Sequence, residues 1–400
     1  MLSVAEAEKT ILSRALTPEG ETVALADAPG RILAEDLVAD RDFPPFDRVT
    51  MDGIAIRHEA WQKGRRRFAV KGVQAAGSPR LVLADASGCI EVMTGAMLPE
   101  GADTVIQYEH LDISDGVASL RTEAVRLRQN IHFRGVDRQA GATLIPRGTR
   151  VGPAEVAVAA TVGKSRLATA RLPRTAIVST GDELVPVEQI PLPHQIRGSN
   201  GYALQALLAG RFNLPGRIFH YPDDQMEIAA GLKAIFQEYR LVVLSGAVSA
   251  GKFDFVPQVL DDLGVIKHFH GVAQRPGKPF WFGTLPDGCA IFALPGNPVS
   301  AFTCACRYLL PFLSRSLGEK PSPPERAALS EAVVFKPALT YFLPVSVSST
   351  PAGSLQAYPL PGHGSGDLAN LTAADGFLEL PADRDTFPAG EVFPFIRFRF

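Results

Sequence analysis

Residues 241–254 read LVVLSGAVSAGKFD, and this stretch decides the fold class of the chain. Its first four residues are aliphatic without interruption, which is typical of a strand buried on both faces of a parallel sheet. The small residues that follow let backbone N–H groups approach an anion, and a helical pattern begins directly after them. A strand, a glycine-containing loop and a helix in this order predict an α/β unit.

The same alternation continues on both sides of this stretch, from Arg174 to Leu313. Alternating short strands and helices predict a mostly parallel sheet with helices on both faces. The predicted strands are 175–179, 216–220, 265–269 and 290–293, and the predicted helices are 200–209, 225–239, 255–263 and 298–313.

Regions rich in short strands flank this alternation. Upstream, a helix with a capping box at Ser3 and Glu6 opens the chain, and a helix is also expected at 153–162. Downstream of a proline-rich linker at 319–326, short alternating runs predict a small, barrel-like all-β domain. Because a single core rarely serves 400 residues, roughly two to four domains are expected. The upstream strands are predicted at 67–73, 81–83, 89–93, 104–108 and 117–120.

The composition argues against several classes of function. The formal net charge is -2, so no basic surplus points to nucleic acid, and the run 65–67 of three arginines is interpreted as a solvated face. No stretch approaches the ~20 apolar residues of a membrane span, and the N-terminus is too charged for a signal peptide. We therefore expect a cytoplasmic protein that binds neither nucleic acid nor membrane.

The cysteines are interpreted as reduced thiols of the core. They form no Cys-x-x-Cys pair, so the sequence predicts neither a disulfide framework nor a zinc site. They are Cys89, Cys289, Cys304 and Cys306.

Polar loops are predicted at the carboxyl ends of the strands, where open parallel sheets bind ligands. The first loop, residues 179–184, places Asp182 and Glu183 directly after Thr180 and Gly181. Adjacent carboxylates on a turn of small residues suit Mg²⁺. A helix N-cap formed by Asp182 is the alternative interpretation, and the loop alone leaves both open.

The second and fourth loops are candidates for holding an anion. In the second, backbone N–H groups around Ser245 and Gly246 would cradle the anion, while Asp254 would either cap the next helix or bind a metal. The fourth, residues 294–298, is a turn preset by Pro295 and Pro298 that starts a long helix.

The third loop, residues 275–279, reads RPGKP. Arg275 and Lys278 on a rigid turn suit a tetrahedral oxyanion, because arginine binds it with paired bonds and lysine as a point charge. The alternative is a surface turn whose cations are solvated.

These four loops, in this order and spacing, resemble the molybdopterin molybdotransferase family, which includes bacterial MoeA and the E domain of gephyrin. The likeness spans almost the whole chain, because three upstream segments share it. They are FDRVTMDGIA at 46–55, TGAMLPEGAD at 94–103, and RGVD at 134–137 followed by Gly141.

The resemblance implies a multidomain α/β plus β fold in an elongated homodimer. Residues 1–172 would form a linking domain with an inserted β-rich lid at about 48–137. Residues 173–318 would form a central parallel-sheet molybdopterin-binding domain, and residues 326–400 a C-terminal β-barrel. The implied reaction takes adenylylated molybdopterin and molybdate, with Mg²⁺, and yields molybdenum cofactor and AMP. Other enzymes of cofactor assembly are further candidate partners.

The resemblance also implies roles for individual residues. The segment from Ser245 to Gly251 would bind the pterin phosphate, Arg275 and Lys278 would bind molybdate, and Asp182, Glu183 and Asp254 would hold Mg²⁺. The partner subunit would close the site with Asp52, Thr94 and Asp137. The residues assigned to catalysis are Asp52, Asp137, Glu183 and Asp254. The residues assigned to substrate binding are Thr94, Thr180, Gly181, Ser245, Gly246, Ser249, Gly251, Arg275, Lys278, Pro295, Asn297, Pro298 and Ser365.

Several positions depart from the family pattern and keep alternatives open. Lys252 and Phe253 replace a more acidic segment, so an added cation and a lost carboxylate shift the pocket toward positive charge; Ala247, Arg275 and Ile54 also differ. A pterin-binding scaffold without turnover is one alternative, and an enzyme acting on another nucleotide or phosphosugar is a second. The carboxylates at 52, 182, 183 and 254 argue against a plain anion binder, because negative charge hinders anion binding.

Overall fold

The computed structural model describes residues 1–246, 255–362 and 364–399. Within them, six strands form the sheet that was predicted between Arg174 and Leu313, in the order β16-β13-β17-β21-β20-β18. The first four are parallel, whereas β20 runs antiparallel to both of its neighbours. The strands are β13 (Thr175–Thr180), β16 (Gly216–Tyr221), β17 (Leu241–Ser245), β18 (Ile266–His270), β20 (Trp281–Thr284) and β21 (Ala290–Leu294).

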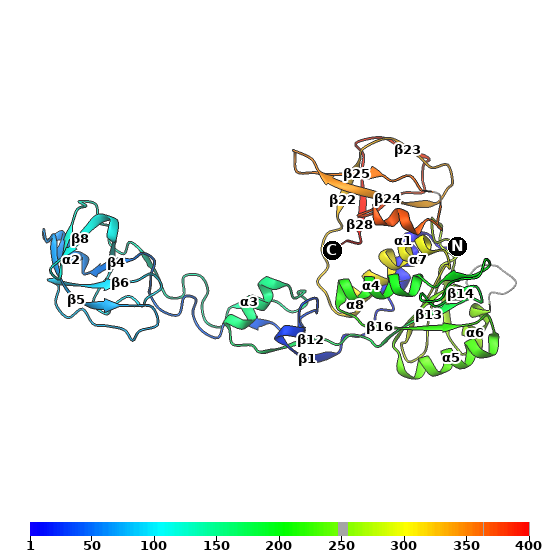
Figure 1. Ribbon diagram of the computed structural model, residues 1–400, viewed down its shortest axis with the longest axis horizontal. Coiled ribbons are helices and arrows are strands. Elements are labelled where there is room, and N and C mark those ends of the chain that lie inside the picture. Colours follow the sequence, from blue (N-terminus) through cyan, green and yellow to red (C-terminus); the bar gives the residue numbers. More distant parts are fainter. Residues whose placement is uncertain (247–254, 363, 400) are drawn as a thin grey trace. The chain divides into compact units, whose positions relative to one another are not determined.

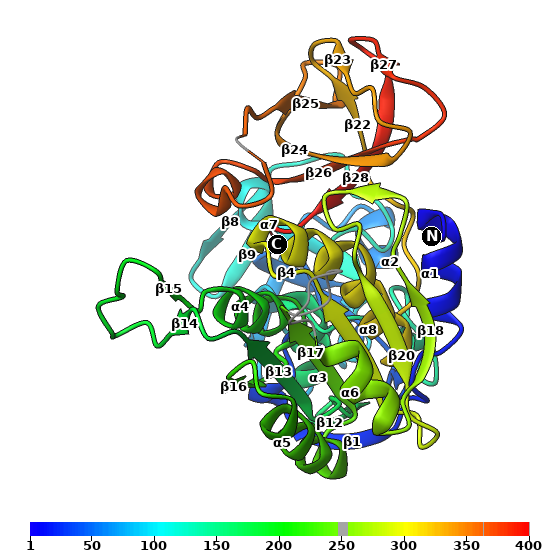
Figure 2. The same cartoon turned by 90° about the vertical axis from the view of Figure 1, so that its right-hand side faces the viewer.

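Helices cover both faces of this sheet, as Figure 1 and Figure 2 show. Successive residues of a strand point to opposite faces, so Val243 joins one core and Val242 and Leu244 join the other. The helices α4 (Asn200–Phe212), α7 (Pro298–Cys304) and α8 (Leu310–Ser316) pack on the first face, and α5 (Gln225–Glu238) and α6 (Val256–Asp262) on the second. This confirms the predicted sheet covered on both faces.

The predicted helix 298–313 contains a π-helical turn, Ala305–Leu309, between α7 and α8. Pro311 follows this turn, and proline removes the hydrogen bond to the residue four positions earlier and clashes with its carbonyl. The wider turn therefore lets the chain continue as a helix past a residue that would otherwise break it.

The N-terminal helix α1 (Val4–Leu12) packs into the first core and confirms the predicted capping box. Ser3 N–H donates to Glu6 Oε2 at 2.8 Å, and Glu6 N–H donates to Ser3 Oγ at 3.3 Å. Val4, Ala7 and Ile11 are buried in the same core as β17 and β21. After α1, the strand β1 (Gly20–Ala24) pairs with β12 (Arg166–Ala170) in antiparallel fashion.

Five strands of the described C-terminal residues close into the predicted barrel. The strand β24 pairs with both β25 and β26, and β22 and β28 complete the circle. One further strand, β19 (Gln274–Arg275), joins β24 from outside the barrel in parallel register. The barrel strands are β22 (Arg326–Leu329), β24 (Thr340–Ser349), β25 (Leu355–Pro359), β26 (Gly376–Leu380) and β28 (Val392–Arg397), and β23 (Val333–Val334) pairs with β27 (Thr386–Phe387) beside them.

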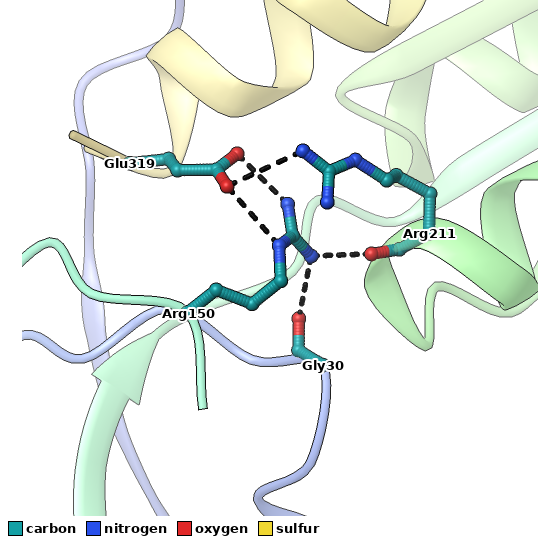
Figure 3. A network of polar contacts seen from close by, with 4 residues as sticks. All are labelled: Gly30, Arg150, Arg211 and Glu319. Atoms are coloured by element: carbon teal, nitrogen blue, oxygen red, sulfur yellow. Dashed lines mark hydrogen bonds and ion pairs between the residues drawn. The ribbon is translucent and has the colours of Figure 1, made fainter. Parts of the chain in front are cut away.

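All these elements belong to one compact unit, residues 1–35, 147–156 and 165–400, called here the larger unit. A network of charges joins three of its segments (Figure 3). Glu319 accepts hydrogen bonds from Arg150, at 2.8 and 3.1 Å, and from Arg211 at 3.4 Å. Arg150 also donates to the carbonyl oxygens of Gly30 and Arg211. The network therefore ties the chain near residue 150 to the ends of α4 and α8.

Residues 36–146 and 157–164 form the smaller unit, which is described by itself. Its sheet has the order β7-β4-β6-β5-β9-β8. The predicted strand 81–83 is wrong, because Val82 forms only an isolated bridge with Glu100. The elements are β2 (Leu37–Val38), β3 (Arg48–Val49), β4 (Gly53–Ile56), α2 (His58–Gln62), β5 (Arg67–Gln74), β6 (Gly88–Val92), β7 (Thr104–Gln107), β8 (Leu111–Ser114), β9 (Val117–Leu120), β10 (Ile131–His132) and β11 (Thr143–Ile145), with α3 (Pro153–Thr161) crossing the boundary.

The four cysteines are free and buried, which confirms their interpretation as core thiols. Burial raises the pKa of Cys89, Cys289 and Cys304 to about 12, so these side chains are neutral thiols at pH 7. No helix in the described part of the chain has the length and apolar character needed to cross a bilayer.

Candidate functional site

The described residues of the four polar loops predicted from the sequence lie at one edge of the parallel sheet. Three of them follow the carboxyl ends of β13, β17 and β21. The loop of residues 275–279 leads from β18 into β20; because both β18 and β21 run antiparallel to β20, β18 ends at the edge where β21 ends. This is the edge at which open α/β sheets bind their ligands.

A cavity of about 520 Å³ opens at this edge, within the range of small-molecule sites. Its walls come from the first, second and fourth loops and from the start of α4. The lining residues are Ser179, Thr180, Gly181, Glu183, Leu184, Ile196, Arg197, Gly198, Ser199, Asn200, Asp223, Ser245, Gly246, Pro279, Pro295, Gly296, Asn297 and Pro298.

A larger hollow of about 740 Å³ lies in the smaller unit around Arg65 and Arg66. Two of its cations are already neutralised, because Lys63 pairs with Glu59 and Arg66 pairs with Glu123. It also lies outside the sheet edge where the predicted loops meet. We therefore place the site in the cavity of the larger unit.

Two buried hydroxyl groups lie in the cavity wall. Thr180 Oγ1 is buried and has no hydrogen-bond partner among the described residues. Ser245, which is 3% exposed, accepts a hydrogen bond of 2.7 Å from Asn200 Nδ2. Because an unpaired buried hydroxyl costs about 1–3 kcal/mol, the Thr180 hydroxyl is suited to meet a ligand atom.

Glycine is required at position 246, directly after Ser245. Its φ is +107°, in the region that favours glycine, and a Cβ there would lie 2.9 Å from the carbonyl oxygen of Thr180. The first and second loops are therefore packed against each other without room for a side chain.

Carboxylates occupy one side of the cavity. Glu183 lines it, as predicted, and so does Asp223, which the sequence analysis did not select. Asp182 turns to the backbone instead, where its Oδ1 accepts the N–H of Asp223 at 3.1 Å. The alternative of a helix N-cap at Asp182 is wrong, because the strand β14 (Leu184–Val185) follows it.

The magnesium site stays a prediction. Among the described residues no three His, Cys, Asp or Glu side chains are grouped so as to hold a metal. Three predicted residues, Asp254, Ser249 and Gly251, lie outside the described residues.

The cations of the third loop do not line the cavity. The pairing of β19 with β24 holds Arg275 beside the barrel, with its guanidinium 6.0 Å from the centre of the Phe335 ring. Lys278 is exposed on the same turn, and only its neighbour Pro279 reaches the cavity wall. Their assignment to molybdate remains a prediction, and the expectation that they share the lining of this cavity is not met.

The backbone of this turn is supported by the fully buried Gln274. Its Nε2 donates to the carbonyl oxygens of Pro276, at 3.1 Å, and Gly277, at 3.4 Å. Its Oε1 accepts the hydroxyl of Tyr308, which is also buried. The turn is therefore held from beneath by a side-chain amide whose hydrogen-bonding groups are all used.

We expect Tyr308→Phe to lower the free energy of unfolding of the larger unit by about 1–3 kcal/mol, because it leaves Gln274 Oε1 buried without a donor. The measurement is the urea unfolding midpoint of the larger unit. Tyr358→Phe is the matched control, since the Tyr358 hydroxyl bonds Gln356 at 3.0 Å on the surface. Equal losses in the two variants would contradict the role given to Gln274.

The predicted residues of the smaller unit form two polar contacts. Asp52 Oδ1 accepts hydrogen bonds from the backbone N–H and the hydroxyl of Thr94, at 2.6 and 2.8 Å, and these bonds lower the pKa of Asp52. Asp137 Oδ1 bonds His132 Nε2 at 2.9 Å, and the other ring nitrogen of His132 faces Arg48 at 3.0 Å. Asp52 and Thr94 therefore come from two different family segments, 46–55 and 94–103, and contact each other.

The fourth loop is joined by a residue from the C-terminal region. Asn297 Nδ2 donates to Ser365 Oγ at 3.0 Å, and the carbonyl oxygen of Ser365 accepts the N–H of Val299 at 3.1 Å. Ser365 therefore lies against the start of α7, although it is not itself part of the cavity wall.

Six lining residues lie outside the four predicted loops and were not assigned to the site from the sequence: Ile196, Arg197, Gly198, Ser199, Asn200 and Asp223. Asp223 follows the carboxyl end of β16, so the strand-end rule applied to the other loops would have found it. Arg197, the only cation in the described lining, is brought to the rim by the pairing of β14 with β15 (Ile196–Arg197). Figure 2 shows this segment projecting beyond α4. Neither Arg197 nor Asn200 follows a strand of the main sheet, so no local signal marks them.

Comparisons with known proteins agree on one family. Residues 2–163 match a family model described as "MoeA N-terminal region (domain I and II)", residues 176–315 match "Probable molybdopterin binding domain", and residues 326–398 match "MoeA C-terminal region (domain IV)".

Similar proteins cover the whole chain. A Synechocystis protein named molybdopterin molybdenumtransferase is 40% identical, covering 99% of each chain. A Staphylococcus epidermidis protein of the same name is 32% identical, covering 98% of this chain and 94% of its own length. The crystal structure of a molybdopterin biosynthesis MoeA protein from Pyrococcus horikoshii OT3 has a TM-score of 0.83 at 27% identity, covering 99% of each chain.

Proposed function

The chain belongs to the molybdopterin molybdenumtransferase family, and from this premise we propose that its sheet-edge cavity binds adenylylated molybdopterin, onto which the protein places molybdate with release of AMP. Membership makes the protein a transferase of molybdenum-cofactor biosynthesis. The nucleotide leaving group and the location of the substrate are the parts that we propose.

The observation that carries this proposal is that two buried hydroxyls, those of Thr180 and Ser245, end neighbouring strands in the cavity lining. Thr180 has no partner among the described residues, and Ser245 uses its oxygen to accept from Asn200, so both O–H groups can donate to a ligand. A phosphate or pyrophosphate oxygen satisfies such donors, whereas an apolar ligand would leave them unpaired. The location at the carboxyl edge of a parallel sheet supports the same ligand class.

Carboxylates beside these hydroxyls support phosphoanhydride chemistry. Glu183 and Asp223 line the same cavity, and carboxylate oxygens are ligands that Mg²⁺ accepts. Mg²⁺ would be held by Glu183 with Asp182 and Asp254, and when bound it would neutralise charge on the pyrophosphate. The hydroxyls of Thr180 and Ser245 then orient the phosphate, and Glu183 can polarise the attacking water.

The incoming molybdate and the second subunit complete the proposal. Lys278 precedes Pro279, which lines the cavity, so the turn can present its cation at the rim to a dianion. We propose a cytoplasmic homodimer in which Asp52, Thr94 and Asp137 of a second copy close the site. The bonds from Thr94 hold the pKa of Asp52 low, so Asp52 brings a negative charge.

We expect Glu183→Gln to slow molybdate-dependent AMP release about 100-fold while adenylylated molybdopterin still binds, because the neutral amide keeps the shape but is a weaker metal ligand and cannot take a proton. The assay measures AMP at graded molybdate with Mg²⁺. Glu188→Gln is the matched control, since Glu188 is exposed and outside the cavity lining. AMP release by Glu183→Gln at the wild-type rate would refute the role of this carboxylate.

A further inference from the structure

The carboxamide of Asn200 joins two loops of the cavity. Its Nδ2 donates to Ser245 Oγ in the second loop, at 2.7 Å, and to the carbonyl oxygen of Gly296 in the fourth, at 2.8 Å. These loops touch at their glycines, since a Cβ on Gly296 would lie 3.6 Å from the Cα of Gly246. Asn200 is the first residue of α4, so the bond anchors both loops to a helix.

The chemistry of Gly296 fixes which way this amide faces. A carbonyl oxygen can only accept, so the nitrogen of Asn200, and not its oxygen, must point toward Gly296. The same nitrogen faces Ser245 Oγ, which therefore also accepts. The hydroxyl hydrogen of Ser245 must then point elsewhere, and it meets no acceptor in the described part of the chain.

The orientation matters because it leaves the Ser245 hydroxyl hydrogen available in the cavity lining. Ser245 directly precedes Gly246, and Thr180 Oγ1 would lie 3.2 Å from a Cβ on that glycine. Because side chains alternate along a strand and Ser245 pairs with Ser179, the Thr180 hydroxyl lies on the other face of the sheet from the Ser245 hydroxyl. The two hydroxyls are therefore separate donors at the ends of neighbouring strands. Donors held in this way suit the oxygens of a tetrahedral oxyanion.

We infer that Asn200 is a positioning residue that holds the second loop against the fourth and sets Ser245 as a hydrogen-bond donor to a tetrahedral oxyanion in the cavity. This inference rests on the proposed function, which supplies two such groups, the phosphate of the pterin substrate and molybdate. Asn200 acts through Ser245, so its removal weakens ligand binding by freeing the serine hydroxyl and loosening the contact between the loops.

The test measures the dissociation constants of adenylylated molybdopterin and of molybdate alone for wild type, Asn200→Ala, Ser245→Ala and the double variant. We expect Asn200→Ala to weaken one of the two ligands at least about tenfold. The weakened ligand identifies the oxyanion. In the Ser245→Ala background the same change should have little further effect, because the group through which Asn200 acts is already gone.

The matched control is Gln205→Ala on the same helix. Gln205 Nε2 donates to the carbonyl oxygen of Gly216 at 2.6 Å, at the amino end of β16 and away from the cavity. Its loss should lower thermal stability about as much as Asn200→Ala and leave both dissociation constants unchanged. If Asn200→Ala does not fold, Asn200→Asp keeps the shape; its carboxylate would accept from Ser245 but could not bond the carbonyl oxygen of Gly296. Ser199→Asp, on the adjacent lining residue, controls for the added charge.

Two results would overturn the inference. Wild-type affinity of Asn200→Ala for both ligands would show that Asn200 positions nothing. If the losses of affinity of the two single variants multiply in the double variant, Asn200 does not act through Ser245. If the wild type itself fails to bind adenylylated molybdopterin, the proposed function fails instead, so the two failures are distinguishable.

Discussion

A Gly246→Ala variant is expected to lose about 100-fold in kcat/KM for molybdate insertion. The φ of Gly246 is +107°, and the new Cβ would lie 2.9 Å from the carbonyl oxygen and 3.2 Å from the hydroxyl of Thr180. The Thr180 carbonyl belongs to β13, an inner strand of the sheet, and is held in place by it. The added methyl group is therefore accommodated by a displacement of the second loop. A displacement near 1 Å in a substrate-positioning segment lowers rates about 100-fold. The measurement is steady-state AMP release at saturating molybdate.

The control for this prediction is Gly288→Ala. Gly288 has a φ of +90°, so alanine is strained there as well, but nothing lies within 4 Å of its Cβ. It precedes β21 at the edge of the sheet opposite the cavity. We expect Gly288→Ala to lose stability but keep its activity. Similar activity losses in both variants would show that backbone strain, and not the contact with Thr180, explains the effect.

The Glu319→Gln variant is expected to lower the free energy of unfolding of the larger unit by about 2–4 kcal/mol. The Glu319 side chain is 14% exposed and is the carboxylate shared by Arg150 and Arg211 in Figure 3. Both guanidinium groups also lie over the Phe212 ring, at 4.9 and 5.6 Å from its centre. Burial is the main cause that lowers the pKa of Arg211, and the charge of Arg150 is the second. Removal of the Glu319 carboxylate therefore leaves these two neighbouring guanidinium groups without their shared counter-charge.

Glu325→Gln is the control for this variant. Glu325 also pairs with an arginine, Arg397 at 2.8 Å, but these side chains are 46% and 32% exposed. An exposed pair contributes about 0–1 kcal/mol, so the control should stay close to wild type in urea unfolding. An equal loss of unfolding free energy in Glu325→Gln and Glu319→Gln would show that burial of the ion pair does not explain the effect.

Much of the fold was predictable because its pattern is local. The strands β13, β17 and β21 are buried along their whole length and have apolar centres, since both faces of the sheet are covered, and such apolar runs stand out in the sequence. The strand β20 was missed because Trp281–Thr284 is short and contains Gly283, so no alternation marks it. The wrong strand at 81–83 shows the converse, since β-forming residues there find only an isolated partner.

The candidate site was predictable where it follows strand ends and unpredictable where it depends on tertiary pairing. Thr180 and Ser245 end their strands, Glu183 lies in the loop after β13, and all three line the cavity as expected. The position of Arg275 depends on the pairing of β19 with a barrel strand far away in the sequence. Asn200 is likewise marked only by its two partners, which lie 45 and 96 residues away.

The most direct test of the central claim is a crystal structure of the protein with adenylylated molybdopterin. We expect phosphate oxygens of the ligand within hydrogen-bond distance of Ser245 Oγ and of Thr180 Oγ1, with the nucleotide toward Glu183. A ligand bound with both hydroxyls still unpaired, or bound outside the cavity at the carboxyl edge of the sheet, would contradict it.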